Sequence, residues 1–248
     1  MGEISSTGDQ MLQLLELIAV EGPRTTAELA SAAGINRTVT HRLINTLHGR
    51  GYVVRQGKGF ILGPVFEQMA GRGQFESLMR TVQPIMRDLC ETLGETVVLH
   101  RMDGDAAVVV DQAISDRHLV RVHHREGSRH SLTVGASGRA ILAFQPPAFQ
   151  KRLISQCADP EALVAKLKSV VEEGFSRSQN ELQQGVVGAA IPLEDLNGVV
   201  AFSLAVLLPI QRAEHLEVAI PALLKARSAL GAELRRNSGK LSSAAVHA

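Results

Sequence analysis

The stretch from Asn36 to His48 carries side chains suited to nucleic-acid recognition. Asn36 is a favoured N-cap residue, so we predict a helix that begins there. Four apolar residues recur at helical spacing and predict its buried face: Val39, Leu43, Ile44 and Leu47. The opposite face is polar and cationic with no acidic residue, whereas a merely solvated helix mixes both signs. Such a face suits phosphate oxygens and base edges.

We expect polar residues of this helix and its neighbouring segments to contact DNA. Base edges or nearby phosphates are the expected contacts of Arg37, Thr38, Thr40, His41 and Asn45. Phosphates are the expected contacts of Arg42, Arg55 and Lys58. The predicted DNA-binding set also includes Thr26 and Asn36.

The segments around this helix predict a winged helix-turn-helix. Residues 9–20 form an amphipathic pattern with Leu12, Leu15 and Ala19 on one side. A second helix, capped by Thr25 or Thr26, ends before Gly34. Strands at 52–55 and 60–62 flank a glycine-containing turn with a basic tip, the wing. The alternative is a winged helix that serves only in protein interactions.

The charge distribution supports a polyanion partner. The formal net charge of the chain is only +1, yet residues 24–63 hold six basic residues and one acidic residue. The rest of the chain is therefore net acidic. A local positive patch on an otherwise acidic protein attracts a polyanion in one orientation, although a chance cluster is the competing explanation.

Size and composition limit the remaining classes. With 248 residues, 45% of them apolar and 21% charged, the chain is globular and forms one large domain or two ordinary ones. No apolar run is long enough to span a bilayer, and the first residues lack a signal pattern, so we expect a cytoplasmic protein without a membrane partner. Cys90 and Cys157 are expected to be reduced thiols.

Beyond residue 63 the pattern predicts a linker helix and then an α+β domain. Glycines at 71 and 73 suggest a break, so we divide the chain into residues 1–63, a linker of 64–74, a domain of 75–236 and a disordered tail of 237–248. Expected strands are 95–101, 106–111, 118–123, 186–193 and 199–207. Expected helices are 137–144, 147–155, 160–173 and 211–235, which together predict an α+β sandwich.

Several motifs in both halves resemble those of the IclR family of bacterial transcriptional regulators. In the first half they are Thr26-Ala-Glu-Leu-Ala, Arg37 to Leu47, Gly51-Tyr-Val and Phe60-Ile-Leu-Gly. In the second half they are Gly135-Ala-Ser-Gly-Arg-Ala-Ile-Leu-Ala, Asn180-Glu181 with Gly185, and Ala189-Ala-Ile-Pro. The resemblance implies a winged helix fused to a GAF-like effector domain, a homodimer or homotetramer, and control of a catabolic operon by a small acidic metabolite.

A ligand site is expected at residues 133–139. The run Gly135-Ala-Ser-Gly lets a ligand approach the backbone at the start of a helix, where free amides favour an anion. Arg139 is expected to be structural more often than ligand-binding. The resemblance implies effector contacts at Ala136, Ser137, Gly188, Ser203 and Ala205. Relatives that bind small keto acids can have a cysteine at Gly188 and an acidic residue at Ser178, so we hypothesise a roomier pocket and a larger acid, aromatic or branched.

Two other functions remain open. Gly135-Ala-Ser-Gly lacks the spacing of a nucleophile elbow, which disfavours a hydrolase. His123, His124 and His130, with Asp111 or Asp116, lack the ligand spacing that zinc needs, so we expect no metal and no cofactor. A regulator whose second domain only oligomerises is the other alternative. The mechanism we expect is a dimer on a near-palindromic operator, with the spacing of its recognition helices set by the effector.

Overall fold

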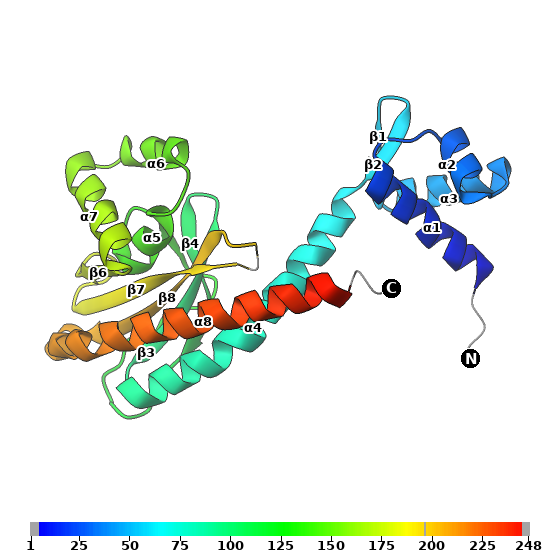
Figure 1. Ribbon diagram of the computed structural model, residues 1–248. Coiled ribbons are helices and arrows are strands. Elements are labelled where there is room, and N and C mark those ends of the chain that lie inside the picture. Colours follow the sequence, from blue (N-terminus) through cyan, green and yellow to red (C-terminus); the bar gives the residue numbers. More distant parts are fainter. Residues whose placement is uncertain (1–4, 196, 245–248) are drawn as a thin grey trace. The chain divides into compact units, whose positions relative to one another are not determined.

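The computed structural model describes residues 5–195 and 197–244, without the side chains of 70–72, 235 and 237–244. The chain divides into two units, Met1–Phe75 and Glu76–Ala248, drawn in Figure 1. Helix α4 (Pro64–Leu93) crosses this division. No helix in the described ranges is both long and apolar enough to span a membrane.

The first unit is a small helical domain with a two-stranded hairpin. Its elements are α1 (Ser6–Glu21), α2 (Thr26–Ala33), α3 (Arg37–Gly49), β1 (Val53–Gln56), β2 (Gly59–Leu62) and the start of α4. Apolar side chains from all three helices and both strands form one buried core, including Leu14, Leu29, Ile44, Val53 and Phe60. This order of elements is the predicted winged helix-turn-helix.

Local side-chain and backbone signals place the ends of α2 and α3. The Thr25 hydroxyl accepts a bond from the Glu28 amide (3.3 Å), and the Glu28 carboxylate accepts one from the Thr25 amide (2.7 Å), a capping box. The bonds that the Thr25 amide and the Thr25 hydroxyl (2.8 Å) donate to the Glu28 carboxylate hold its pKa below the usual value. Gly34 then adopts φ 64°, the left-handed conformation that ends α2. The Asn36 carboxamide accepts a bond from the Thr38 amide (2.9 Å) and starts α3.

Helix α1 buries a different side from the one that we predicted. Leu14 and Ile18 are buried, whereas Leu12 is 60% exposed and Ala19 is exposed as well. The helix is apolar on more than one side, so its periodicity alone did not identify the core side. Two large apolar side chains of α1, Leu12 and Val20, are left on the surface of this unit.

Helix α4 is continuous through Gly71 and Gly73, where we predicted a break. A glycine inside a helix costs only about 1 kcal/mol relative to alanine, too little to end a 30-residue helix. Pro84 also lies within α4. The part of α4 in the second unit buries Leu78, Val82 and Met86.

The second unit is a six-stranded sheet with helices on both faces. Its strands are β3 (Thr96–Asp103), β4 (Ala106–Ala113), β5 (Arg129–Ser131), β6 (Ser176–Gln179), β7 (Val186–Glu194) and β8 (Val200–Pro209), in the order β5-β4-β3-β8-β7-β6. Every neighbouring pair is antiparallel. Helices α5 (Gly135–Leu142), α6 (Pro147–Ile154) and α7 (Pro160–Glu173) cover one face, and α8 (Leu216–Ala244) covers the other (Figure 1). The predicted α+β class is confirmed.

One predicted strand, the absence of β5 and β6 from the prediction, and the end of the last helix need correction. Residues 118–123 form no strand, and Leu119 is 98% exposed. The alternating pattern there has no strand to pair with, and β5 takes the edge instead. The short, polar β6 was not predicted. A 3-10 turn (Ile210–His215) leads into α8, which continues to Ala244, so most of the predicted tail continues this helix; 245–248 lie outside the described residues.

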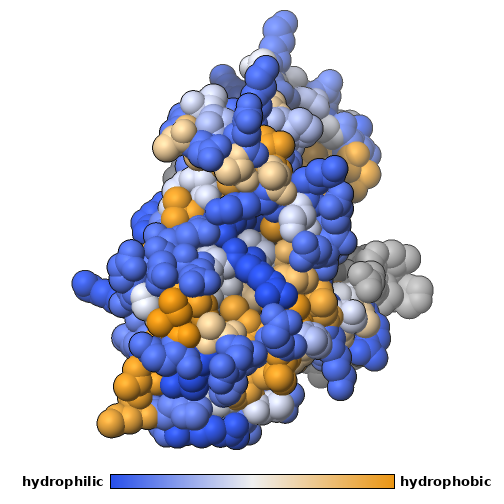
Figure 2. Space-filling view, turned by 90° about the vertical axis from the view of Figure 1, so that its left-hand side faces the viewer, coloured by the Kyte–Doolittle hydropathy of each residue, from blue (hydrophilic) through white to orange (hydrophobic). Residues whose placement is uncertain are grey.

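Figure 2 shows one face of the molecule. Hydrophobic residues gather there in separate groups between hydrophilic ones. Single exposed apolar side chains of the second unit, such as Val164, Val171 and Val218, are consistent with this mixed surface. Isolated groups of this kind are ordinary on a globular protein.

A buried ion pair connects α5 to the segment between β6 and β7. The side chain of Arg139 is 2% exposed. Its Nη1 donates to Glu181 Oε2 (2.5 Å), and its Nη2 donates to Glu181 Oε1 (3.0 Å) and to the Arg177 carbonyl (2.6 Å). The Gly135 amide donates to Glu181 Oε2 (2.9 Å), so this carboxylate also caps α5. The predicted structural role of Arg139 agrees with this geometry.

The surroundings of Glu181 favour its charged form. Burial by itself raises the pKa of the carboxyl group, but the bonds from Arg139 and Gly135 and the charges of Arg139 and Lys166 outweigh it. The net pKa of Glu181 therefore lies below the ordinary value of 4.5.

Two glycine substitutions test the role of the left-handed residue. Gly34→Ala should lower the free energy of unfolding by about 1 kcal/mol, since alanine is strained at φ 64°. Gly73→Ala, in open space inside α4, should raise it by about 1 kcal/mol. Urea unfolding followed by circular dichroism measures both. Equal effects of the two substitutions would contradict the assigned conformations.

A second prediction concerns the buried pair. Glu181→Gln leaves the Arg139 guanidinium without its counter-charge and should cost about 3 kcal/mol at neutral pH. Because the folded pKa of Glu181 is lowered, its contribution is full above about pH 4.5 and is lost as the pH falls through the folded pKa. Urea unfolding at neutral and acidic pH should therefore show the variant and the wild type converging in acid.

The matched control is Glu217→Gln. Glu217 pairs with Arg177 at 3.0 Å, but its side chain is largely exposed. Its loss should cost less than about 1 kcal/mol. A cost equal to that of Glu181→Gln would mean that burial does not distinguish the two pairs.

Candidate functional site

Five of the predicted DNA-binding residues share the exposed side of α3. They are Arg37, Thr38, His41, Arg42 and Asn45. The Asn45 amide nitrogen donates to His41 Nδ1 (3.2 Å), because an amide nitrogen has no lone pair to accept with. The side chains on this face are therefore dominated by hydrogen-bond donors, which match phosphate oxygens and purine N7 and O6 acceptors.

The prediction that Thr40 faces DNA is wrong. It is 0% exposed, and its Oγ1 donates to the Asn36 carbonyl (3.1 Å). Val39, predicted to be buried, is 37% exposed instead. The two positions are adjacent, and α3 is rotated slightly from the orientation that hydrophobicity alone predicts, because a threonine can bury its methyl group and bond its hydroxyl within the helix.

The structure places the remaining first-unit candidates around α3. The carboxamide oxygen of Asn36 is used as the α3 cap, while Thr26 is half-buried at the first turn of α2. Lys58 is exposed in the two-residue turn between β1 and β2, next to Gly57 at φ 60°. Arg55 is exposed too, with its guanidinium 5.5 Å from the centre of the Phe60 ring. The wing therefore presents two cations.

The second unit contains a narrow cavity beside the start of α5. The cavity itself has a volume of about 20 Å³, room for about one water molecule, and the surrounding hollow that opens to solvent has an empty volume of about 400 Å³. The lining residues are His100, His124, Ala136, Ser137, Ser178, Glu181, Leu182, Gln183, Val186 and Leu207. Two predicted effector residues, Ala136 and Ser137, are among them. Ser203 and Ala205 are completely buried on β8 and do not line the cavity.

Gly188 does not enlarge this cavity, contrary to our expectation. A Cβ atom at this position would lie 2.8 Å from Leu207 Cδ2 and 3.1 Å from the Val206 carbonyl oxygen. Leu207, on the neighbouring strand, already fills the space that the glycine leaves and itself lines the cavity. The argument for a roomier pocket from Gly188 is therefore wrong.

Three histidines gather at the cavity. The His100 ring lies 5.4 Å from that of His130 and 6.4 Å from that of His124, between centres. His130 Nε2 is 3.1 Å from the Ser137 hydroxyl oxygen. His100 Nδ1 and Ser203 Oγ are buried without a hydrogen-bond partner, and these two residues face each other across β3 and β8. Buried polar atoms normally have a partner, so this pair marks the region as a candidate ligand site.

Burial favours neutral imidazoles in this cluster. Desolvation, followed by repulsion from His130 and His124, holds the pKa of His100 well below its usual value. Desolvation likewise lowers the pKa of His124, with added repulsion from His130 and His123. For His130, desolvation outweighs the opposing effect of its backbone hydrogen bonds.

The sequence predicted only part of this site. The sequence analysis missed His100, which ends an apolar run that predicts a strand. A single histidine within such an apolar strand was the signal that could have identified it as a site residue. His123, grouped with His124 and His130 as an alternative metal cluster, is exposed. Among the described residues, no three or more His, Cys, Asp or Glu side chains are arranged to hold a metal ion.

The first amide of α5, at the helix start where we predicted an anion site, is already occupied. Glu181 occupies the Gly135 amide, and its charge is matched by Arg139 and by Lys166 Nζ at 3.3 Å. An acid group that enters the cavity therefore meets a carboxylate already seated at the first amide of this helix.

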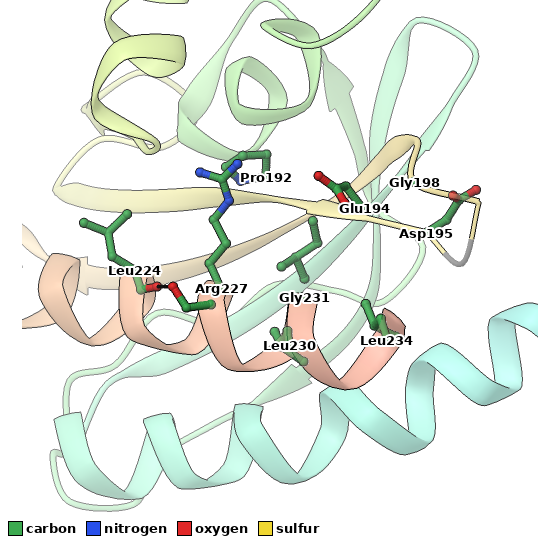
Figure 3. Close-up of a pocket in the computed structure, with 11 residues that line it drawn as sticks. Pro192, Glu194, Asp195, Gly198, Leu224, Arg227, Leu230, Gly231 and Leu234 are labelled. Carbon is green, nitrogen blue, oxygen red and sulfur yellow. Dashed lines mark hydrogen bonds between the residues drawn. The ribbon is translucent and has the colours of Figure 1, made fainter. Parts of the chain in front are cut away.

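A second and larger hollow lies between α8 and the β7–β8 hairpin. Figure 3 shows Arg227 extending from α8 toward Pro192, with Glu194 and Asp195 near the hairpin end and Leu230 and Leu234 below. The Arg227 guanidinium donates to the Gly174 carbonyl (3.3 Å) and lies 5.8 Å from the Phe144 ring centre. None of the predicted effector residues lines this hollow.

Comparison with known proteins agrees with both halves of this description. Residues 9–57 match the IclR helix-turn-helix domain, and residues 76–230 match the bacterial transcriptional regulator IclR C-terminal domain. The chain is 30% identical to the transcriptional regulator TtgV of Pseudomonas putida over 86% of this chain and 85% of that protein. It is 29% identical to the regulator BhcR of Paracoccus denitrificans over 80% of this chain and 75% of that protein.

A solved structure has the same fold. It is an IclR homologue from Microbacterium hydrocarbonoxydans in complex with 4-hydroxybenzoate, 22% identical, with a TM-score of 0.59 over 93% of this chain and 100% of that one. The named relatives are regulators rather than enzymes, which removes the hydrolase alternative. The chain belongs to the IclR family of DNA-binding transcriptional regulators.

Proposed function

We propose that this regulator binds a near-palindromic operator as a homodimer or homotetramer and that a small organic acid, bound in the second unit, changes its affinity for that operator. The expected target is a catabolic operon, and the expected location is the cytoplasm, where the DNA is. Effector binding would act by changing the spacing between two recognition helices.

The observation that carries the effector part is the cavity beside α5. Its lining includes His100 Nδ1, a buried polar atom that lacks a partner. Ser203 Oγ does not line the cavity, but it lies on the strand position paired with His100 and also lacks a partner. Leaving a buried polar group unsatisfied costs about 1–3 kcal/mol, a cost that a ligand with a matching polar group can relieve. If no ligand bound here, the unsatisfied polar atoms would only destabilise the folded protein.

The relative bound to 4-hydroxybenzoate supports an aromatic acid as the first class of effector to test. The sequence argument for an aromatic acid depended on Gly188 and is wrong, so the expectation of an aromatic acid now depends on this relative. Binding in the cavity would require movement of side chains such as Leu182 and Leu207, since the space is narrow. Closed ligand sites that open on binding are common among regulatory proteins.

Two exposed apolar side chains of α1 are candidates for the contact in the proposed oligomer. Leu12 and Val20 are large apolar side chains on the surface of the first unit. A second copy of this chain would cover them, and a two-fold dimer matches a near-palindromic site. A second unit that only oligomerises is the remaining alternative, and it predicts that no acid changes operator binding.

Lys58 and Arg37 test how DNA contacts divide between wing and helix. Lys58→Ala should weaken binding to all DNA sites about equally and reduce the salt slope of log K by about one, because a lysine at the wing tip contacts phosphate. Arg37→Ala should reduce the preference for operator over unrelated DNA. Fluorescence anisotropy at several salt concentrations measures both quantities. A loss of site preference in Lys58→Ala would contradict the proposed role of the wing.

A thermal-shift screen against small aliphatic and aromatic acids tests the effector. An acid that binds only the folded protein should raise the unfolding midpoint, by an amount that grows with its concentration. The same acid should change the affinity for the DNA upstream of the protein's own gene. A flat screen with intact operator binding would favour the alternative in which the second unit only oligomerises.

A further inference from the structure

The acid group of an effector needs a receptor, and the backbone at the start of α5 is a poor one in this chain. Glu181 already accepts the Gly135 amide at 2.9 Å. Arg139 directs both terminal nitrogens to Glu181 and the Arg177 carbonyl, and Lys166 pairs with the same carboxylate. Displacing Glu181 would leave the guanidinium of Arg139, which is almost completely buried, without its partner.

The other polar side chains of the lining are Ser137, Ser178, Gln183 and the histidines, and of these only the histidines can take up a proton near neutral pH. His100 is 1% exposed, lines the cavity and has an unpartnered Nδ1. His124 lines the same cavity, and His130 reaches it through Ser137. The cluster therefore offers imidazole nitrogens to a ligand but no cation of its own, because burial keeps these rings neutral.

A bare carboxylate in such a place is unfavourable. Burying an anion without a counter-charge is costly, and the group takes up a proton where it can. The charged groups facing the cluster are Glu181 and, bound to it, Arg139 and Lys166, while His123, next to His124 in the chain, is exposed. From the strands beside His100, β8 contributes Ser203 and β4 contributes Val109, both uncharged.

We propose that an acid effector binds on the cluster of His100, His124 and His130 with the uptake of one proton from solvent, so that the regulator responds to its acid more strongly as the pH falls. The proton is shared between the ligand's acid group and an imidazole, forming a charge-assisted hydrogen bond. This inference rests on the proposed function and names the receptor for the acid within that cavity.

The direction of the pH dependence of effector affinity follows from the linkage between proton binding and ligand binding. In the free protein the histidines are neutral at neutral pH. A negative ligand beside them raises their pKa, so binding takes up a proton. Affinity should then rise as the pH falls, by up to about tenfold per pH unit, until the pH reaches the low pKa of the free cluster.

Isothermal titration calorimetry of the full chain measures this proton directly. The probes are benzoate, 4-hydroxybenzoate, phenylacetate and a branched 2-keto acid, between about pH 6 and about pH 8, where their carboxylates are ionised. Repeating each titration in buffers of different ionisation enthalpy gives the number of protons taken up. We expect about one near neutral pH and a dissociation constant that grows with pH.

Two variants locate the proton. His100→Asn and His124→Gln keep a polar amide but cannot titrate, and each should reduce the proton uptake and the pH dependence. The backbone of His124 is held by Gln112, whose Oε1 accepts from the His124 amide (3.2 Å) and whose Nε2 donates to its carbonyl (2.5 Å). His124→Gln should therefore fold even if His100→Asn does not. His123→Gln, at an exposed neighbour, is the matched control and should behave as the wild type.

The possible results separate the two proposals. Binding that changes operator affinity without proton uptake, and is unaffected in both cluster variants, overturns this inference and leaves the proposed function standing. Binding that is lost in Arg227→Gln but kept in the cluster variants places the acid in the hollow along α8 and also overturns it. If none of the acids binds, the inference fails together with the effector part of the proposed function, while operator binding stays intact.

Discussion

The cavity of the second unit depends on the buried charge pair between Arg139 and Glu181. The Arg139 guanidinium holds the start of α5, the edge strand β6 and the segment before β7 in one arrangement, because its donors are directed to Glu181 and the Arg177 carbonyl. These three segments are also walls of the cavity. A buried ion pair is weak support for stability by itself, since desolvation offsets much of its attraction. Its effect here is to fix geometry, because neither partner can leave without exposing the other to an apolar surrounding.

The first unit is determined by more local means, which explains why its elements could be predicted from sequence. Asn36 caps α3 within two residues, and Gly34 ends α2 through its own backbone conformation. These signals act over a few residues and are visible in a sequence. The prediction failed where tertiary packing decides between adjacent positions, as with Val39 and Thr40, or where an expected break has too small a cost, as at Gly71 and Gly73.

The cavity shows a different limit. The small residues Ala136 and Ser137 could be predicted as part of its lining, because their types and their position at a helix start are local features of the sequence. The sequence did not place His100 there, since its role depends on the register that sets it opposite Ser203 on β8. A slip of one residue would turn this side chain to the other face of the sheet. The filling of the Gly188 space by Leu207, from the adjacent strand, is also invisible without that register.

Val39 is exposed and Thr40 is buried, the reverse of what we predicted, and this changes the chemistry of the recognition surface. Val39 adds an apolar side chain to a face otherwise made of donors and cations. In a major groove its natural counterpart is the methyl group of thymine, which carries no charge and accepts no hydrogen bond. Contacts made by arginine and lysine weaken as counterions compete for the phosphates, whereas an apolar contact does not. Any base discrimination supplied by Val39 would thus persist at ionic strengths where the electrostatic part of the affinity has faded.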